Sequence, residues 1–138
     1  MFGLFKKKKS MQSAEDYEKI ASLNRIYMDC RSSVIIGWKD LKEYSGKKAE
    51  RYEALCRENI QQYYKWILEA SKHPGFERPT QVDAFINLAK LYEKQGEYAK
   101  ALAICQEAIS IGATYDGTKG GMQGRLQRLW NKDAKENA

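Results

Sequence analysis

The side chains that could do catalytic chemistry are few in this chain and form no recognisable set. His73 is the only histidine, and Cys30, Cys56 and Cys105 have no spacing typical of a metal site or a disulfide framework. No Ser-His-Asp context, Cys-His pair or glycine-rich dinucleotide loop is present, and the acidic residues alternate with Lys and Arg as on solvated helix faces. The sequence therefore predicts a protein that is not an enzyme, with no catalytic residue, metal or cofactor. We interpret the cysteines as small core residues and His73 as a cation at a helix C-terminus.

One glycine-rich segment has residues that could bind an anion. Residues 116–121 read Asp-Gly-Thr-Lys-Gly-Gly and lead into a last predicted helix that runs to about Asn131. Glycines before a helix, with Lys119 nearby, suit a phosphate at the helix N-terminus. The phosphate-loop pattern is absent, however. Apolar residues recur along this helix at Met122, Leu126, Leu129 and Trp130. We therefore favour a closing helix that covers the end of a helical array over an anion site.

The first nine residues combine a short apolar tip with a run of lysines. The tip residues are Phe2, Leu4 and Phe5, and the lysines are Lys6, Lys7, Lys8 and Lys9. Such a tip could enter a membrane interface while the lysines meet anionic headgroups, at about 1 kcal/mol for each basic residue. The alternative is a solvated chain end, as many proteins have. We expect residues 1–12 to form a flexible basic tail.

The positive charge is concentrated in this tail. The net charge is +6, and the four lysines supply +4 of it, which leaves +2 for the remaining 20 basic and 18 acidic residues. The apolar tip precedes the basic run, which is the reverse of a secretory signal, and no stretch is long enough to span a bilayer. We expect a cytoplasmic protein, peripheral at the inner membrane face if the tip binds lipid.

Apolar residues recur at helical steps through most of the chain, which predicts an all-α fold. One long helix is expected over about 13–44, with a bend near 32–37, and a second over about 47–72. Because their connection is short, the two helices should be antiparallel neighbours. Tyr27 and Trp38 lie on the first helix and are candidate interface aromatics. We expect a single domain over residues 13–131 and a frayed C-terminus over 132–138.

Two shorter helices follow, and their spacing is the most specific pattern in the chain. The first carries Phe85-x2-Leu88-Ala89-x2-Tyr92, and the second carries Tyr98, Ala101, Cys105 and Ala108. Gly96 stands at the turn between them, where a left-handed conformation ends the first helix. This pattern resembles a tetratricopeptide repeat (TPR) over about a quarter of the chain, with Phe for the usual Trp, Ala for Gly and Cys for Phe.

The TPR resemblance implies an antiparallel helical bundle or short solenoid of about five helices that binds a partner. In TPR proteins the first helix of each pair lines a concave groove. The corresponding positions here are Asp83, Ile86, Asn87, Lys90 and Lys94. Asn87 and Lys90 are of the types that hold a peptide backbone or C-terminal carboxylate in some TPR proteins, although an ordinary polar helix face is the alternative.

Three functions compete at this point. The first is a non-enzymatic adaptor or scaffold that binds a protein or peptide partner or pairs with itself as a homodimer. The second is a nucleic-acid-associated protein that uses the lysine tail with Arg125, Arg128 and Lys132. The third is an accessory protein at a membrane surface, tethered by the tail. The nearly neutral body argues against nucleic acid, because phosphate contacts dominate such binding. The sequence therefore favours the adaptor.

Overall fold

The computed structural model describes the backbone of residues 2–137 and the side chains of residues 14–137. The helices are α1 (Phe2–Asp40), α2 (Lys47–Ala70), α3 (Asp83–Lys94), α4 (Tyr98–Ser110) and α5 (Gly121–Glu136). Within the described backbone, the one strand-like pairing is an isolated bridge between Gln81 and Tyr115. The prediction of an all-α fold with about five helices is confirmed.

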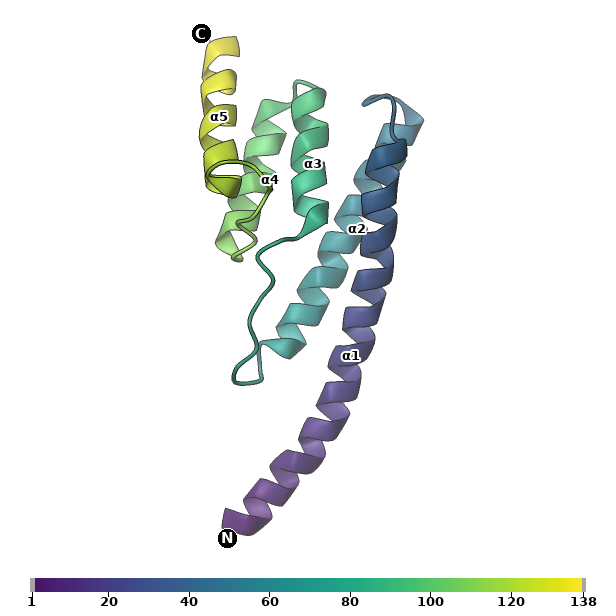
Figure 1. The fold of residues 1–138 in the computed structure, drawn as a ribbon, viewed down its shortest axis with the longest axis vertical. Coiled ribbons are helices and arrows are strands. Elements are labelled where there is room, and N and C mark those ends of the chain that lie inside the picture. The colour runs from purple at the N-terminus through teal and green to yellow at the C-terminus, as the bar shows by residue number, and fades with distance from the viewer. Residues whose placement is uncertain (1, 138) are drawn as a thin grey trace.

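Helices α1 and α2 form a long antiparallel hairpin (Figure 1). Helix α1 ends at Asp40, four residues before the expected end, and it is continuous through residues 32–37, where a bend was expected. Gly46 begins α2 with φ of 88°, a conformation that suits glycine. The helix assignment of α1 begins at Phe2, but the side chains of the first 13 residues lie outside the described ones. The flexible tail over residues 1–12 therefore stays a prediction.

Helices α3 and α4 form the shorter pair that the spacing predicted. Gly96 has φ of 75°, and the backbone N–H of Glu97 reaches back to the carbonyl of Tyr92 at 2.8 Å, which closes the end of α3. Ala89 and Ala101 are completely buried. Small residues at these two positions allow the close helix approach that the pattern indicated.

The helices stack in the order of the sequence (Figure 1). Helix α3 packs against both helices of the long hairpin, α4 packs against α3, and α5 packs against α4. The largest completely buried side chains come mainly from α2, α3 and α5, and include Tyr63, Tyr92, Phe85, Leu88, Leu91, Met122 and Leu129. No helix among the described residues has the length and apolar character needed to cross a bilayer.

Helix α5 differs from the expectation in three ways. It continues to Glu136, whereas fraying was expected from Lys132. Arg125, expected on a basic surface, is 7% exposed and pairs with Asp116, and Lys132 binds Glu93 of α3 at 2.7 Å. Trp130, expected on the apolar face, is 59% exposed. Met122 and Leu129 alone supply the fully buried apolar contact, so the helix is positioned by ion pairs as well as by apolar burial.

Candidate functional site

The groove predicted on α3 is largely filled by the long hairpin. Ile86 and Asn87 are 6% and 7% exposed, and the Asn87 amide donates a buried hydrogen bond to the Tyr52 hydroxyl at 3.1 Å. Asp83 accepts from Arg31 of α1 at 3.3 Å. Ile86 and Asn87 therefore do not face an open groove, because α1 and α2 pack on this side of α3, and Asp83 is half-buried in its pair with Arg31.

The two lysines of the predicted groove are more accessible. Lys90 is half-buried and Lys94 is exposed. The Lys94 ammonium lies 5.7 Å from the centre of the Tyr44 ring, in the range of a cation–π contact. These two side chains remain on the surface, whereas Ile86 and Asn87 of the predicted groove are buried beneath the long hairpin.

The candidate interface aromatics belong to the packing of the hairpin. Tyr27 is 2% exposed and stacks on Trp66 of α2, with ring centres 5.5 Å apart. Trp38 is half-buried between Tyr44 and Tyr52, at 5.6 and 5.9 Å. Tyr27 cannot contribute to a surface for a partner without unfolding, so this part of the prediction is wrong. Periodicity had correctly placed it on the apolar stripe.

The candidate membrane tip cannot be compared with the structure. The side chains of Phe2, Leu4, Phe5, Lys6, Lys7, Lys8 and Lys9 lie outside the described residues. Membrane contact by these residues stays a prediction.

The glycine-rich segment before α5 is held by contacts within the protein. The backbone N–H of Met122 donates to the carbonyl of Thr114 at 2.8 Å, so it is not free for an anion. Arg128 reaches back to the Lys119 carbonyl at 3.3 Å and to the Thr118 hydroxyl at 3.0 Å. These contacts favour the interpretation of α5 as a closing helix.

The thiols are buried or half-buried, and the histidine packs against an aromatic ring. Burial raises the pKa of Cys56 to about 12 and that of Cys105 to about 11, so both stay protonated at neutral pH. His73 stacks on Tyr17, and its ring nitrogen lies 3.9 Å from Asp16. Within the part of the chain that the structure describes, no three His, Cys, Asp or Glu residues gather as metal ligands.

The buried polar groups link helices to one another. The Tyr52 hydroxyl donates to the carbonyl of Val34 at 2.6 Å, and the Asn59 amide donates to the carbonyl of Tyr27 at 3.0 Å. The Tyr92 hydroxyl donates to Glu53 at 2.9 Å. Each bond joins α2 to a neighbouring helix, so these groups fix the relative positions of α1, α2 and α3.

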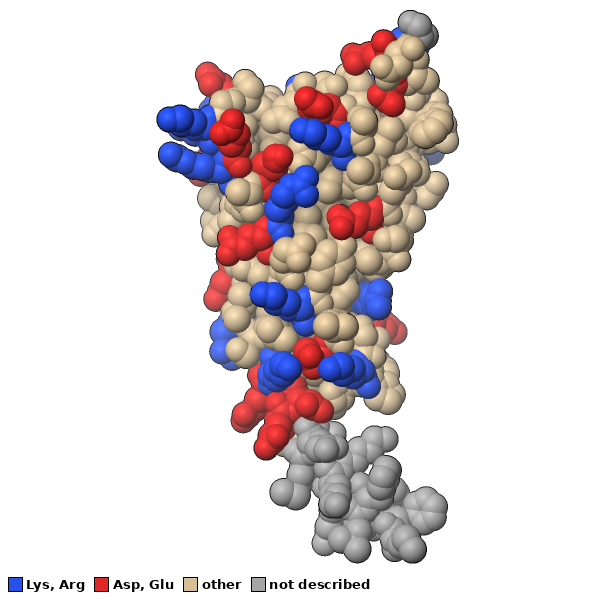
Figure 2. Space-filling view, turned by 180° about the vertical axis from the view of Figure 1, so that it is seen from behind, with Lys and Arg blue, Asp and Glu red and all other residues tan. Residues whose placement is uncertain are grey.

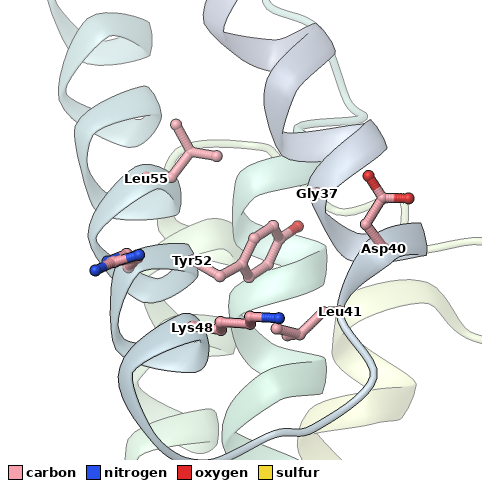
Figure 3. A pocket seen from close by; sticks show the side chains of 7 residues that line it. Gly37, Asp40, Leu41, Lys48, Tyr52 and Leu55 are labelled. Atoms are coloured by element: carbon pink, nitrogen blue, oxygen red, sulfur yellow. The ribbon is translucent and has the colours of Figure 1, made fainter.

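A pocket of about 330 Å³ opens between the end of α1 and the start of α2 (Figure 3). Tyr52 points from α2 toward Gly37 of α1, with Leu55 on one side and Leu41 and Lys48 on the other. Gly37 lacks a side chain, and a Cβ built there would lie 2.9 Å from the Tyr52 ring. Leu41 and Leu55 are half-buried and line the pocket beside the buried Tyr52 ring, so its floor is apolar.

A second hollow of about 230 Å³ lies further along the same two helices. We define the hairpin seam as the surface formed by the residues that line the two hollows. These are Leu23, Ile26, Gly37, Asp40 and Leu41 on the α1 side, and Lys48, Arg51, Tyr52, Leu55, Glu58, Gln61, Gln62 and Lys65 on α2. Most of them recur at three- and four-residue steps, which places them along one face of each helix. Of the described residues, only those of α1, α2 and their connection line the seam.

A third hollow of about 310 Å³ lies near the ends of α2 and α4. It is lined by Tyr64, Ile67, Leu68, Ser71, Arg78 and Ile111. Leu68 is 67% exposed there. Burial and the neighbouring Glu107 carboxylate raise the pKa of Tyr64, so this hollow has a carboxylate as well as Arg78 beside it. One charge of each sign lies beside this hollow, so its lining favours neither an acidic nor a basic partner.

Charges of both signs are mixed over the face in Figure 2. Lys and Arg side chains lie among Asp and Glu side chains there, and the described residues of that face form no continuous basic patch. A nucleic-acid interface normally presents such a patch.

Comparison with protein-family models, with curated proteins and with solved structures finds no match to this chain. The TPR resemblance of residues 82–113 therefore stays a resemblance of pattern.

Sequence reasoning missed the hairpin seam. Gly37 lies within the range 32–37 where a bend was expected, but a side chain at this position would collide with the Tyr52 ring of α2. Lys48 and Arg51 were not singled out, because Lys and Arg are common on solvated helix faces. The spacing of Gly37, Leu41, Lys48 and Leu55 around a short connection was the signal available, since residues on both sides of a hairpin turn come together.

Proposed function

We propose that this protein is a non-enzymatic adaptor that binds a protein or peptide partner through the hairpin seam. The observation that supports the proposal is the pocket of Figure 3, where an apolar floor and polar rim open to solvent. Protein interfaces combine an apolar centre with a polar rim in this way.

The second hollow extends the same surface. Ile26 is 51% exposed beside it, and Leu23 lines it from the neighbouring turn of α1. Two hollows along one pair of helices suit a partner that lies lengthwise over the hairpin, as helices and extended peptides do. A second copy of this chain is the self-associating form of the same proposal.

The remaining helices would serve as a base for this surface. Helix α3 packs against both helices of the hairpin and is bonded to them through Asn87 and Asp83. Binding to a surface whose helices are already fixed costs little ordering entropy. No set of side chains around the seam resembles a nucleophile with its base, so catalysis is not part of the proposal.

Photo-crosslinking in the native host tests the proposal. We would introduce benzoylphenylalanine in place of Ile26 or Asp40 on the seam, and in place of Ala103 or Gln106 on the exposed face of α4 as matched controls. We expect a discrete adduct from the two seam positions and none from the two controls. An adduct of twice the chain mass would identify self-association. Adducts from the α4 positions alone, or none at any position, would reject the seam as the binding surface.

A further inference from the structure

The rim of the Figure 3 pocket holds more cations than carboxylates. Lys48 and Arg51 line the pocket from α2, and of the residues whose side chains are described, Asp40 is the only acidic one that lines it. Among the described side chains, none of these three takes part in an ion pair. Lys48 and Arg51 therefore remain available to a partner's carboxylates.

The positive charge continues into the adjoining connection between α1 and α2. A further hollow there is lined by Lys42, Glu43 and Lys47 in addition to Asp40 and Lys48. At the other end of the seam, Glu58 and Lys65 balance each other. The excess of cations is thus confined to the end of the seam that holds the apolar pocket.

The shape of the pocket indicates what enters it. Only residues 37–41 and 48–55 line it, so it is a hollow on the surface of two helices rather than an enclosed cavity. Such a hollow suits one large apolar side chain that projects from a partner. Carboxylates on the residues flanking that side chain would then lie near Lys48 and Arg51.

We infer that the Figure 3 pocket receives an aromatic or large aliphatic side chain from an acidic segment of a partner protein. This inference rests on the proposed adaptor function and adds the chemical class of the partner. Lys48 and Arg51 select the acidic flanks by charge complementarity, and the apolar lining from Leu41 and Leu55 selects the apolar side chain.

Fluorescence anisotropy with short labelled peptides tests the inference on the full chain. The first probe is Glu-Asp-Phe-Asp-Glu, and its two comparisons are the same peptide with a central alanine and the basic peptide Lys-Arg-Phe-Arg-Lys. We expect saturable binding of the first probe below about 1 mM, weaker binding of the alanine peptide and no binding of the basic one. Binding of the first probe should weaken with added salt, because exposed charges are screened.

A charge-reversed pair of variants locates the binding. Lys48→Glu combined with Arg51→Glu should weaken the binding of the acidic probe by about tenfold. The control combines Lys119→Glu with Lys135→Glu, two exposed lysines outside the described ion pairs, and gives the same net charge. It should change the affinity by less than about twofold. Since both double variants keep Lys6 to Lys9, attraction of the probe to the tail would be equal in the two.

Four results would each overturn the inference. They are equal losses in the two double variants, equal binding of the acidic and basic probes, equal binding of the phenylalanine and alanine probes, and no saturable binding of the acidic probe. Displacement of the acidic probe by a single-stranded oligonucleotide at equal concentration would also overturn the inference, because it would indicate that the partner is a nucleic acid rather than an acidic protein. If crosslinked adducts form at Ile26 and Asp40 but the acidic peptide does not bind, the proposed adaptor function is supported and only the acidic class of partner is rejected. A bound acidic peptide without adducts in the host would reject the adaptor function instead.

Discussion

Gly37 is the residue that sets the distance between the two long helices. A Cβ at this position would lie 2.9 and 3.1 Å from two carbons of the Tyr52 ring. Tyr52 cannot move aside easily, because it is 5% exposed and its hydroxyl bonds to both the Val34 carbonyl and the Asn87 amide. The absence of a side chain at Gly37 is therefore a packing requirement, because the Tyr52 ring occupies the space that a Cβ would need.

Replacing Gly37 by alanine tests this packing. Alanine favours a helix over glycine by about 1 kcal/mol, but overpacking against a fixed ring costs about 1 to 3 kcal/mol. We therefore expect Gly37→Ala to lower the free energy of unfolding by about 1 kcal/mol in urea titration. Ser33→Ala, at an exposed position one turn earlier in α1, is the control and should cause no loss. A gain in stability for Gly37→Ala would show that α1 and α2 can separate there at no cost.

At the scale of single residues, the sequence predicted which apolar side chains are buried better than it predicted which polar side chains form buried hydrogen bonds. Tyr27, Cys56 and Cys105 lie on apolar stripes and are buried as the periodicity indicated. Asn87 and Arg125 have polar side chains and were expected on the surface. They are buried because Tyr52, 35 residues from Asn87, and Asp116, in the loop before α5, supply their hydrogen-bond partners.

Helix α5 is attached to the rest of the chain by a group of charged side chains. Arg125 binds Asp116 at 2.7 Å and Glu93 of α3 at 3.1 Å, and Lys132 binds Glu93 at 2.7 Å. Burial alone would raise the pKa of Asp116, but hydrogen bonds from Thr118 and Arg125 outweigh it, and the pKa lies below its usual value. The same balance, with Lys132 and Arg125, lowers the pKa of Glu93.

These lowered pKa values give stability a predictable dependence on pH. A carboxyl group whose pKa is lower in the folded state stabilises the fold above its unfolded pKa, and this contribution is lost as the pH falls through the folded pKa. The ordinary values are 3.8 for Asp and 4.5 for Glu. We therefore expect the free energy of unfolding to fall as the pH is lowered from about 5 toward 2.

Asp116→Asn measures the share of this effect that belongs to the buried pair. It should cost about 3 kcal/mol at pH 7, because it leaves Arg125 buried without its closest carboxylate. The cost should shrink as the pH falls, since protonation weakens the pair in the parent chain as well. Denaturant titrations at pH 7 and pH 3 give both values. Glu136→Gln, an exposed change on the same helix, serves as the control. A cost that is equal at the two pH values would mean that the Asp116 carboxylate is not the titrating partner of Arg125.

At the scale of helices, periodicity predicted α2, α3 and α4 to within a few residues. Gly46 and Gly96 interrupt the apolar pattern and do end or begin helices. The end of α5 was predicted less well, because Lys132 and its neighbours look like a solvated tail until Glu93 of α3 is placed beside them. An ion pair between segments 39 residues apart leaves no local signal.

The arrangement of the whole molecule decides which surface stays open. Helices α1 and α2 have 39 and 24 residues, much longer than the 12 residues of α3. The long hairpin therefore covers the side of α3 that a repeat pattern alone would leave as a groove. Its own opposite side, the hairpin seam, has no described helix against it, and the sequence could not show this because it depends on how the pairs stack.

The distribution of charge over the whole molecule predicts how it meets anionic surfaces. The full chain carries +6, and residues 10–138 carry +2 of it. Each basic residue near an anionic membrane contributes about 1 kcal/mol, so Lys6 to Lys9 with the apolar tip should dominate any binding to such a surface. We expect the full chain to sediment with vesicles that contain phosphatidylserine, less so at high salt, and a variant that lacks residues 1–9 to stay in solution.

Two further variants separate the parts of the tail in the same sedimentation measurement. Glutamine at all four lysine positions should abolish most of the binding, whereas Phe2→Ser with Phe5→Ser should leave a weaker, salt-sensitive remainder, because the lysines act through charge and the tip through burial. Equal sedimentation of the full chain and the variant without residues 1–9 would contradict the expectation. The binding would then have to come from cations of the body, and the four basic residues around the Figure 3 pocket, Lys42, Lys47, Lys48 and Arg51, would be the first to reverse.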